Sequence, residues 1–320
     1  MLMLDGAAIG RLVSIRQVVD CLEEAFRSDC LVPLRQVVAV PGAEPTRAFV
    51  SMPAFDPSGA GVVKIATVFP RNPEKGKPTV QAIIIAFSDL GTPTAILDGN
   101  VVTYLRTGAA SALASRYLSR LDSAHLVIIG TGELAPTMAA AHCAVRAIRR
   151  VSVWGRRRER ATATAATIRG RVDPAVRVVV AEALDEAVRT ADIVSCATSS
   201  AEPVLLGRWV RPGTFLDLVG SFSPATREAD DDAVSRARLF VDTFEGALAE
   251  AGDVIQPLRS GLIDRSRIEG ELADLVQNRV AGRTSPEEIT LFKSVGTAIE
   301  DLAATRLIVA ACGASTQTHA

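Results

Sequence analysis

The chain has few of the residues that build metal sites and disulfide frameworks. It contains three histidines, His125, His142 and His319, and five cysteines at scattered positions without a CxxC pair. An odd number of unclustered cysteines is typical of proteins kept in a reducing compartment. We therefore predict that the protein binds no metal and is cytoplasmic.

A strong net charge and long apolar runs are also absent. The formal net charge is −1 at pH 7, so no general positive field attracts nucleic acid. No segment approaches the roughly 18 consecutive apolar residues of a membrane-spanning helix. The opening "MLMLDGAAIG" lacks the basic and long apolar regions of a signal peptide. These features predict a protein with neither a nucleic-acid nor a membrane partner.

The composition that remains, 48% apolar and 22% charged, is that of an ordinary α/β protein. In the first third, Ser14 with Gln17 three residues later predicts the start of an amphipathic helix. The strands expected beyond it are not separated by helices, so their sheet should be mixed or antiparallel. These strands are predicted over 47–55, 61–69 and 79–89, with a hairpin turn at 89–93 and a helix over 106–121.

From His125 onward, strand and helix patterns alternate. Regular alternation predicts a doubly wound parallel sheet with its ligand crevice at the carboxyl ends of the strands. The long helix expected over 294–313 should return to the first domain and make it discontinuous. We therefore predict a discontinuous first domain of 1–120 with 297–320, and a second, doubly wound domain of 121–296. The strands of this second domain are expected over 125–130, 150–154, 176–181, 192–198, 214–220 and 238–243.

A Gly-rich loop opens the second domain. After the apolar strand at 125–130 come Gly130, Thr131, Gly132, Glu133, Leu134 and Ala135, which form a G-x-G-x-x-A sequence directly before a helix. Gly130 permits the tight turn, Gly132 lets the backbone approach a pyrophosphate, and Ala135 allows close helix–strand packing. This context predicts dinucleotide binding; the alternative is a tight glycine turn without a ligand.

The sequence "VSVWGRRRER" over 151–160 then bears on which dinucleotide binds. A site that prefers NAD carries an acid at the end of this second strand, whereas an arginine can pair with the 2′-phosphate of NADP(H). We predict that Arg156 and Arg157 select NADP(H), with NAD(H) as the second choice. Arg158 and Arg160 are expected to lie on a solvated helix face, and the alternative is that the whole run does so.

Three cations of the first domain stand in apolar surroundings, namely Arg35, Lys64 and Arg106. Lone buried cations are costly unless they are paired. One interpretation is a shared anionic partner such as a substrate carboxylate. The alternative is that each pairs with a structural acid, for instance Asp89 or Asp98.

The chain resembles the ornithine cyclodeaminase/μ-crystallin family. The match is carried by "VPLR", "SMPAF", "VVKIATVFPRNPEKGKPTVQA", "LDGNVVTYLRTGAASALASRYL", "IIGTGELA", "LVGSFSPATREAD" and "SPEEITLFKSVG", which occur in family order. The resemblance implies a homodimer. Its discontinuous first domain, 1–120 with 297–320, would be the substrate-binding and dimerisation domain, and 121–296 would be a dinucleotide-binding Rossmann domain. The resemblance also implies that Arg35 and Arg106 bind the substrate carboxylate and that Lys64 is the active-site lysine.

The same resemblance places Thr79 beside the nicotinamide and Val219, Gly220 and Ser221 in a loop that faces it. Ala197 and Thr198, at the end of a strand, are expected near a ribose. The complete predicted cofactor set is Thr79, Thr107, Gly130, Thr131, Gly132, Glu133, Leu134, Arg156, Arg157, Ala197, Thr198, Val219, Gly220, Ser221 and Lys293.

Two departures from the cyclodeaminase pattern guide the functional prediction. Where cyclodeaminases carry a Glu that contacts the substrate amine, this chain has Val50, and where they carry a catalytic Asp it has Phe222. We therefore predict an NADP(H)-dependent ketimine reductase of proline metabolism that converts Δ1-pyrroline-2-carboxylate to L-proline, with Phe222 covering the ring. The alternatives are an ornithine cyclodeaminase with a carboxylate from elsewhere, such as Asp217, an alanine dehydrogenase-like enzyme, and a non-catalytic μ-crystallin-like NADPH-binding protein.

Overall fold

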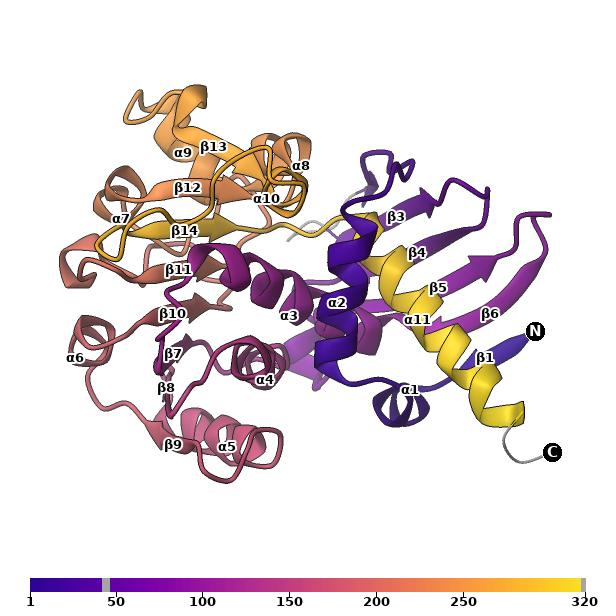
Figure 1. Cartoon of the computed structure of the whole chain (residues 1–320), viewed down its shortest axis with the longest axis horizontal. Helices are drawn as coiled ribbons and strands as arrows, with labels where there is room; N and C mark the ends of the chain where they lie inside the picture. The colour runs from indigo at the N-terminus through magenta and orange to yellow at the C-terminus, as the bar shows by residue number, and fades with distance from the viewer. Residues whose placement is uncertain (42–46, 318–320) are drawn as a thin grey trace. The chain divides into compact units, whose positions relative to one another are not determined.

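The computed structural model of the chain describes residues 1–41 and 47–317 and divides into two compact units. Unit 1 comprises Met1–Arg106 and Thr297–Ala320, and unit 2 comprises Thr107–Gly296. The first boundary falls within helix α3 (Gly99–Leu118), whereas the sequence placed it between residues 120 and 121. This helix begins seven residues before the predicted start at Arg106 and therefore belongs to both units (Figure 1).

Unit 1 is built on a six-stranded mixed sheet with the order β1-β6-β5-β4-β3-β2. Neighbouring strands are antiparallel except β1 and β6, which are parallel. The mixed sheet and the hairpin between β5 and β6 agree with the prediction, while β1 and β2 were not expected. The strands are β1 (Leu2–Leu4), β2 (Gln36–Val40), β3 (Arg47–Phe55), β4 (Gly61–Val68), β5 (Val80–Phe87) and β6 (Pro93–Asp98).

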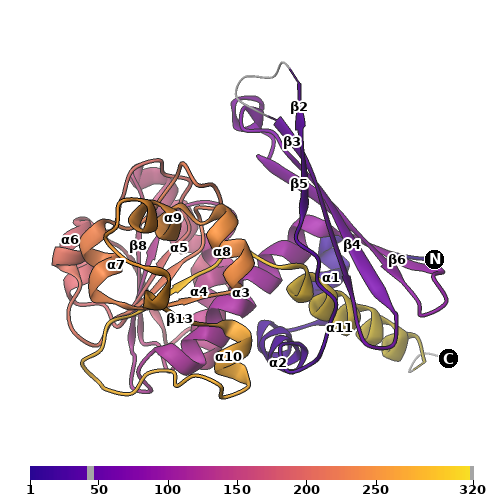
Figure 2. The ribbon, with the colours of Figure 1, turned by 90° about the horizontal axis from the view of Figure 1, so that it is seen from above.

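Helices α1 (Gly6–Leu12), α2 (Ile15–Ala25) and α11 (Ala298–Gln317) belong to the same unit. Helix α2 begins with the predicted capping box, in which the Ser14 side chain accepts from the Gln17 backbone N–H and the Gln17 side chain accepts from the Ser14 N–H. Helix α11 packs against α2 and against β3, β4 and β5, so these helices cover one face of the sheet (Figure 2).

Strand alternation separates a covered face from an open face of this sheet. Met52, Lys64 and Ile84 lie opposite one another in register and are all buried on the face covered by α11. The next residues along β4 and β5, Ile65 and Ile83, lie opposite one another and point to the other face of the sheet. Ile83 is 47% exposed. Apolar side chains therefore occupy an open sheet face, which is unusual for a monomeric surface.

Unit 2 is an eight-stranded parallel sheet with the order β13-β12-β14-β11-β10-β7-β8-β9. It confirms the predicted doubly wound fold, with the strand order reversing between the neighbours β7 and β10. Strands β13 and β14 were not predicted, and β14 lies between β11 and β12 although it comes last in sequence (Figure 1). The strands are β7 (His125–Ile129), β8 (Arg150–Trp154), β9 (Arg177–Val180), β10 (Ile193–Cys196), β11 (Phe215–Leu218), β12 (Arg238–Val241), β13 (Ile268–Glu271) and β14 (Thr290–Lys293).

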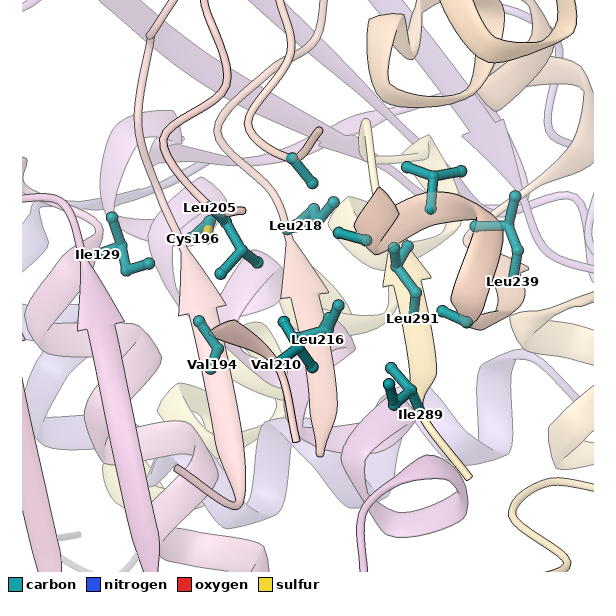
Figure 3. Close-up of a cluster of buried hydrophobic side chains, with 14 of the residues drawn as sticks. Ile129, Val194, Cys196, Leu205, Val210, Leu216, Leu218, Leu239, Ile289 and Leu291 are labelled. Atoms are coloured by element: carbon teal, nitrogen blue, oxygen red, sulfur yellow. The ribbon is translucent and has the colours of Figure 1, made fainter. Parts of the chain in front are cut away.

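The central strands of this sheet are buried on both faces, as parallel strands between helices are. On one face Ile129, Val194, Cys196, Leu218 and Leu291 form an apolar cluster (Figure 3). The helices of the unit, besides its part of α3, are α4 (Ala135–Val145), α5 (Arg158–Arg169), α6 (Leu184–Arg189), α7 (Asp231–Arg236), α8 (Phe244–Glu250), α9 (Gly252–Arg259) and α10 (Leu272–Val276).

Over the described ranges, no helix has the length and apolar character needed to cross a membrane. Among the same residues, no three His, Cys, Asp or Glu side chains are grouped so that they could hold a metal ion. The expected absence of a metal site stays a prediction.

Candidate functional site

A cavity of about 230 Å³ opens in unit 2 where β7, β8 and β10 end. Because β7 and β10 flank the point at which the strand order reverses, this is the edge where doubly wound sheets bind ligands. The cavity is lined by Gly130, Thr131, Gly132, Trp154, Gly155, Arg156, Arg157, Arg160, 197–200 and Val204.

Three glycines allow the chain to form this cavity. Gly130 has φ 126°, and a Cβ there would lie 2.5 Å from the carbonyl oxygen of Ala197. A Cβ on Gly132 would meet nothing within 4 Å, so its backbone faces open space. A Cβ on Gly155 would collide with the side chain of Thr131. The role of Gly155 was not recognised in the sequence, although its place directly after β8 was the clue.

The arginines that follow β8 do not all behave alike. Arg156, Arg157 and Arg160 line the cavity, whereas Arg158 pairs with Glu182 at 3.1 Å on the exposed surface. Arg160 is exposed as predicted, but its place on the cavity wall was not anticipated. Arg160 lies in the first turn of α5, whereas Arg156 precedes its N-cap residue, Arg157. No carboxylate is among the described residues that line the cavity.

Of the other predicted cofactor residues in unit 2, some line this cavity and others do not. Ala197 and Thr198 line it, while Glu133 and Leu134 are not among its lining residues. Glu133 is exposed, and Leu134 is the N-cap residue of α4. Val219, Gly220 and Ser221 directly follow β11, and the Ser221 hydroxyl donates to the carbonyl of Thr226 at 2.5 Å.

Lys293 is placed differently from a residue that touches a cofactor. Its side chain is fully buried at the end of β14, and its Nζ lies 3.1 Å from Asp253 Oδ2 and 3.9 Å from Glu228 Oε2. The ammonium therefore lies between two buried carboxylates, and direct cofactor binding by Lys293 stays a prediction. Glu228 and Asp253 were not recognised in the sequence.

Unit 1 brings two of the three predicted cations together. Lys64 on β4 and Arg106 on α3 are both buried, and both contact Asp301 on α11. The Lys64 Nζ lies 2.7 Å from Asp301 Oδ2, and the Arg106 Nε lies 3.2 Å from Asp301 Oδ1. Arg106 Nη1 also lies 2.6 Å from Glu300 Oε2.

Electrostatics link these cations further. Burial is the main cause that lowers the pKa of Lys64 to about 8, and the charges of Arg106 and Arg35 lower this pKa as well, against the opposing effect of Asp301. Arg35, half-buried just before β2, is therefore close enough to act on Lys64. The third predicted cation belongs to the same electrostatic cluster.

Structural acids do pair with Lys64 and Arg106, but they are not the expected ones. The sequence suggested Asp89 or Asp98, whereas the partners are Glu300 and Asp301. Asp98 instead accepts from the backbone N–H of Asn100 at 2.9 Å at the start of α3. The clue in the sequence was an acidic pair inside the otherwise apolar start of the last helix.

The remaining predicted residues divide between the units. Thr79, half-buried before β5, belongs to unit 1, and its carbonyl accepts from Phe69 at 2.8 Å. Thr107 is buried on α3 next to Arg106. Phe222 belongs to unit 2 and is 43% exposed. Val50, where cyclodeaminases carry a carboxylate, is buried on β3.

Asp217 is the centre of a separate buried network in unit 2. Its carboxylate accepts from Ser111 at 2.7 Å and from Ser195 at 2.8 Å, and it lies 3.1 Å from His142 Nε2. All four side chains are fully buried. This carboxylate joins α3 and α4 to β10 and β11 and is saturated by protein groups.

Comparisons with known proteins agree over nearly the whole chain. The Δ1-pyrroline-2-carboxylate reductase of Paracoccus denitrificans is 41% identical over 299 residues, which cover 93% of this chain and 92% of that protein. The structure of Thermococcus litoralis Δ1-pyrroline-2-carboxylate reductase with NADH and L-proline has a TM-score of 0.94 at 36% identity and covers 99% of this chain and 98% of its own.

An archaeal alanine dehydrogenase dimer with bound NAD is also similar, with a TM-score of 0.90 at 28% identity and coverage of 99% of this chain and 97% of its own. The profile of the ornithine cyclodeaminase/mu-crystallin family matches residues 1–315. This chain therefore belongs to the ornithine cyclodeaminase/mu-crystallin family.

Proposed function

We propose that the protein is an NADPH-dependent reductase that converts Δ1-pyrroline-2-carboxylate to L-proline. The observation that carries this proposal is the joint placement of Lys64 and Arg106 on Asp301, in a chain 41% identical to a named reductase of this substrate. Lys64 and Arg106, held by Asp301 and Glu300, form with Arg35 a cluster of three cations and two acids, whose excess positive charge suits a small ligand with one carboxylate.

In the proposed reaction, Arg35 and Arg106 hold the substrate carboxylate and thereby fix the carbon of the C=N bond. Such fixed orientation contributes several kcal/mol to catalysis, roughly 7–11 in the best cases. Bound NADPH supplies the hydride that is added to this carbon. The ring nitrogen takes one proton, so the C=N bond becomes CH–NH and the products are L-proline and NADP⁺.

Lys64 is the group we assign to that proton. A pKa lowered to about 8 brings the ammonium close to the pH at which it works, as general acids require. Asp301, 2.7 Å from Nζ, holds the ammonium in place. Phe222, exposed on unit 2, offers an apolar surface for the ring.

We assign the 2′-phosphate of NADPH to Arg156 and Arg157. Both line the cavity that follows the Gly-rich loop, and no carboxylate among the described residues lines it. An acid there would repel the phosphate, whereas arginine pairs with it through two parallel hydrogen bonds. Arg160 adds a third positive charge to the same wall.

Ornithine cyclodeamination is the second candidate, and the arrangement of the acids disfavours it. That reaction needs carboxylates near the substrate amines, but Val50 and Phe222 stand where the family pattern has them. Asp217, which the sequence suggested as a replacement, is fully buried among Ser111, Ser195 and His142. Glu300 and Asp301 are paired with Arg106 and Lys64.

The test is oxidation of NADPH, followed at 340 nm, with each of several substrates. Δ1-pyrroline-2-carboxylate should give the highest kcat/KM, above its six-membered homologue piperideine-2-carboxylate and above pyruvate with ammonia or methylamine. Turnover of pyruvate with ammonia alone would indicate an alanine dehydrogenase-like enzyme. Ammonia release from ornithine would indicate a cyclodeaminase, and NADPH binding without any turnover would indicate a binding protein.

Arg106→Ala tests the role assigned to Arg106 in the same assay. It should reduce kcat/KM for the imine by at least about 100-fold, because a buried charged contact is lost. NADPH affinity should change by less than about threefold, since the cofactor is assigned to other residues. Equal loss of both would contradict the role given to Arg106.

We further propose that the protein acts as a homodimer through the open face of the unit 1 sheet. Val38, Phe49 and Ile83 are exposed there at 61%, 43% and 47%. Contiguous apolar surface of this kind is typical of subunit interfaces. The cytoplasmic location stays a prediction from the cysteine pattern, and no nucleic-acid or membrane partner is proposed.

A further inference from the structure

A buried carboxylate connects two loops at the ligand-binding edge of the unit 2 sheet. The first loop begins at Ala197 after β10, and the second begins at Val219 after β11. Strands β10 and β11 are parallel neighbours, so both loops leave the sheet at the edge where doubly wound folds bind ligands. Glu228 lies between the loops and is fully buried.

Each oxygen of Glu228 holds a different loop. Oε1 accepts from the backbone N–H of Thr198 at 2.7 Å and from the Thr198 hydroxyl at 3.0 Å. Oε2 accepts from the backbone N–H of Gly220 at 2.7 Å and, at 3.4 Å, from that of Ser221. One side chain therefore sets the separation of the two loops.

Glycine at position 220 permits this close arrangement. A Cβ there would collide with the Thr198 backbone and would lie 2.6 Å from Glu228 Oε1. Thr198 itself lines the cavity that begins at the Gly-rich loop. A change in the length or charge of Glu228 would thus alter how the Thr198 and Gly220 backbones are held relative to each other.

The negative charge of Glu228 is opposed by the ammonium of Lys293 on β14, the strand that pairs with β11. Lys293 Nζ, fully buried at the end of β14, lies 3.9 Å from Glu228 Oε2 and 3.1 Å from Asp253 Oδ2. Asp253 Oδ1 in turn accepts from the backbone N–H groups of Glu228 at 2.7 Å and Ala229 at 3.0 Å. Burial raises the pKa of Glu228 to about 7, and the Lys293 charge opposes that rise.

Stability alone does not account for this network. Burying three charges costs more free energy than an apolar replacement of similar volume in many proteins. The fold already offers apolar side chains at this depth, such as Cys196 and Leu218. The charged network instead fixes the geometry of the loops after β10 and β11, at the ligand-binding edge of the unit 2 sheet.

We propose that Glu228, paired with Lys293 and oriented by Asp253, is a positioning residue that sets the two loops for hydride transfer and affects the nicotinamide half of the cofactor more than the adenosine half. This inference rests on the proposed use of a nicotinamide cofactor. It assigns to Lys293 an indirect role in place of the direct contact expected from the sequence.

The experiment compares Glu228→Gln and Lys293→Met with Asp192→Asn. Asp192 is a matched control, because its carboxylate also accepts two backbone N–H groups, from Ala124 at 2.8 Å and His125 at 2.9 Å. It directly precedes β10, at the edge of the sheet opposite the cavity. For each protein we would measure kcat, KM, the Kd of 2′,5′-ADP and the fluorescence enhancement of NADPH upon binding.

Glu228→Gln and Lys293→Met should lower kcat about 10- to 100-fold, as small misplacements of reacting groups do. The NADPH fluorescence enhancement should fall, because the nicotinamide environment changes. The Kd of 2′,5′-ADP should stay within about twofold of the original value, since this probe lacks the nicotinamide. Asp192→Asn should lower Tm and leave kcat and the fluorescence enhancement unchanged.

Three results would overturn the proposal. One is unchanged kcat and fluorescence in a folded Glu228→Gln protein. Another is an equal loss of 2′,5′-ADP and NADPH binding, which would make the network part of the whole cofactor site. The third is failure of both variants to fold while Asp192→Asn folds, which would make the network structural. If the unaltered protein reduces no imine, the proposed function fails, yet the two binding measurements still decide the role of Glu228.

Discussion

At the scale of residues, the wall of the unit 2 cavity is shaped by a few side chains at the end of β8. Gly155 lacks the Cβ that would collide with Thr131, so the chain passes close to the Gly-rich loop. Arg156, Arg157 and Arg160 then line the cavity that this loop opens. Arg158, between them in sequence, pairs with Glu182 on the surface and shows that adjacent arginines have different environments.

Replacing Arg156 with Asp and Arg157 with Ser should therefore weaken NADPH selectively. Charge-assisted hydrogen bonds to one phosphate contribute about 1.5–3 kcal/mol each, so the KM of NADPH should rise at least about 10-fold. The KM of NADH should change by less than about threefold. Arg158→Ser is the control and should change neither, and equal weakening of both cofactors would exclude selection by these arginines.

Lys64 predicts a pH dependence of the imine reduction. Burial, together with the charge of Arg106, lowers the pKa of its ammonium to about 8. In the proposed reaction the charged form donates the proton and attracts the carboxylate, so kcat/KM should fall as pH rises through about 8. Lys64→Met should have a low kcat/KM without this decline, and the exposed Lys77→Met should keep the original profile. An unchanged profile in Lys64→Met would assign the decline to another group.

At the scale of elements, polar side chains connect helices to the buried sheet of unit 2. Asp217 on β11 accepts hydrogen bonds from Ser111 on α3 and Ser195 on β10, and it lies 3.1 Å from His142 on α4. A buried carboxylate with several donors is costly to disturb, because each donor would be left unsatisfied. This network holds α3 and α4 against the face opposite the apolar cluster in Figure 3.

Asp217→Asn should lower the free energy of unfolding by about 3 kcal/mol, because an amide cannot accept from every donor around it. Urea unfolding followed by circular dichroism measures this loss. Asp185→Asn on α6, where the side chain is 45% exposed and lies 4.0 Å from Arg189, is the control and should change stability by less than about 0.5 kcal/mol. A loss below about 1 kcal/mol in Asp217→Asn would mean that the network adds little to stability.

Local patterns predicted some elements and missed others for identifiable reasons. The capping box at Ser14 and Gln17 marked the start of α2 because its hydrogen bonds are local in sequence. Strand β14 was missed because Thr290 and Lys293 interrupt a very short apolar stretch, and both are buried through partners on distant segments. Strand β1 has three residues and is fixed by pairing with β6, which no local pattern reveals.

For the molecule as a whole, the open face of the unit 1 sheet is the feature that a single chain leaves unexplained. Val38 and Phe49 are opposite one another on β2 and β3, and Ile65 and Ile83 continue the face on β4 and β5. Several of these apolar side chains are exposed, while the opposite face is covered by α11 and α2. A second copy of the chain would remove this surface from water.

Ile83→Asp should therefore convert the proposed homodimer to a monomer, because it places a charge at the centre of the open face. Analytical ultracentrifugation of both forms at micromolar concentration measures the change. Leu90→Asp, in the exposed turn between β5 and β6, is the control and should remain dimeric. A dimer that survives Ile83→Asp would place the interface on another surface.

The sequence by itself determined the doubly wound sheet, the Gly-rich loop and the presence of isolated cations in the first domain. These depend on strand–helix alternation and on residue types at short spacing, which are local properties of the chain. Only the tertiary structure decided that Glu300 and Asp301 pair with Lys64 and Arg106, that Arg160 joins the cavity wall, and that Lys293 supports Glu228. Each of these contacts joins segments far apart in sequence or depends on which side of a helix faces a cavity, and neither property can be read from residue types at short spacing.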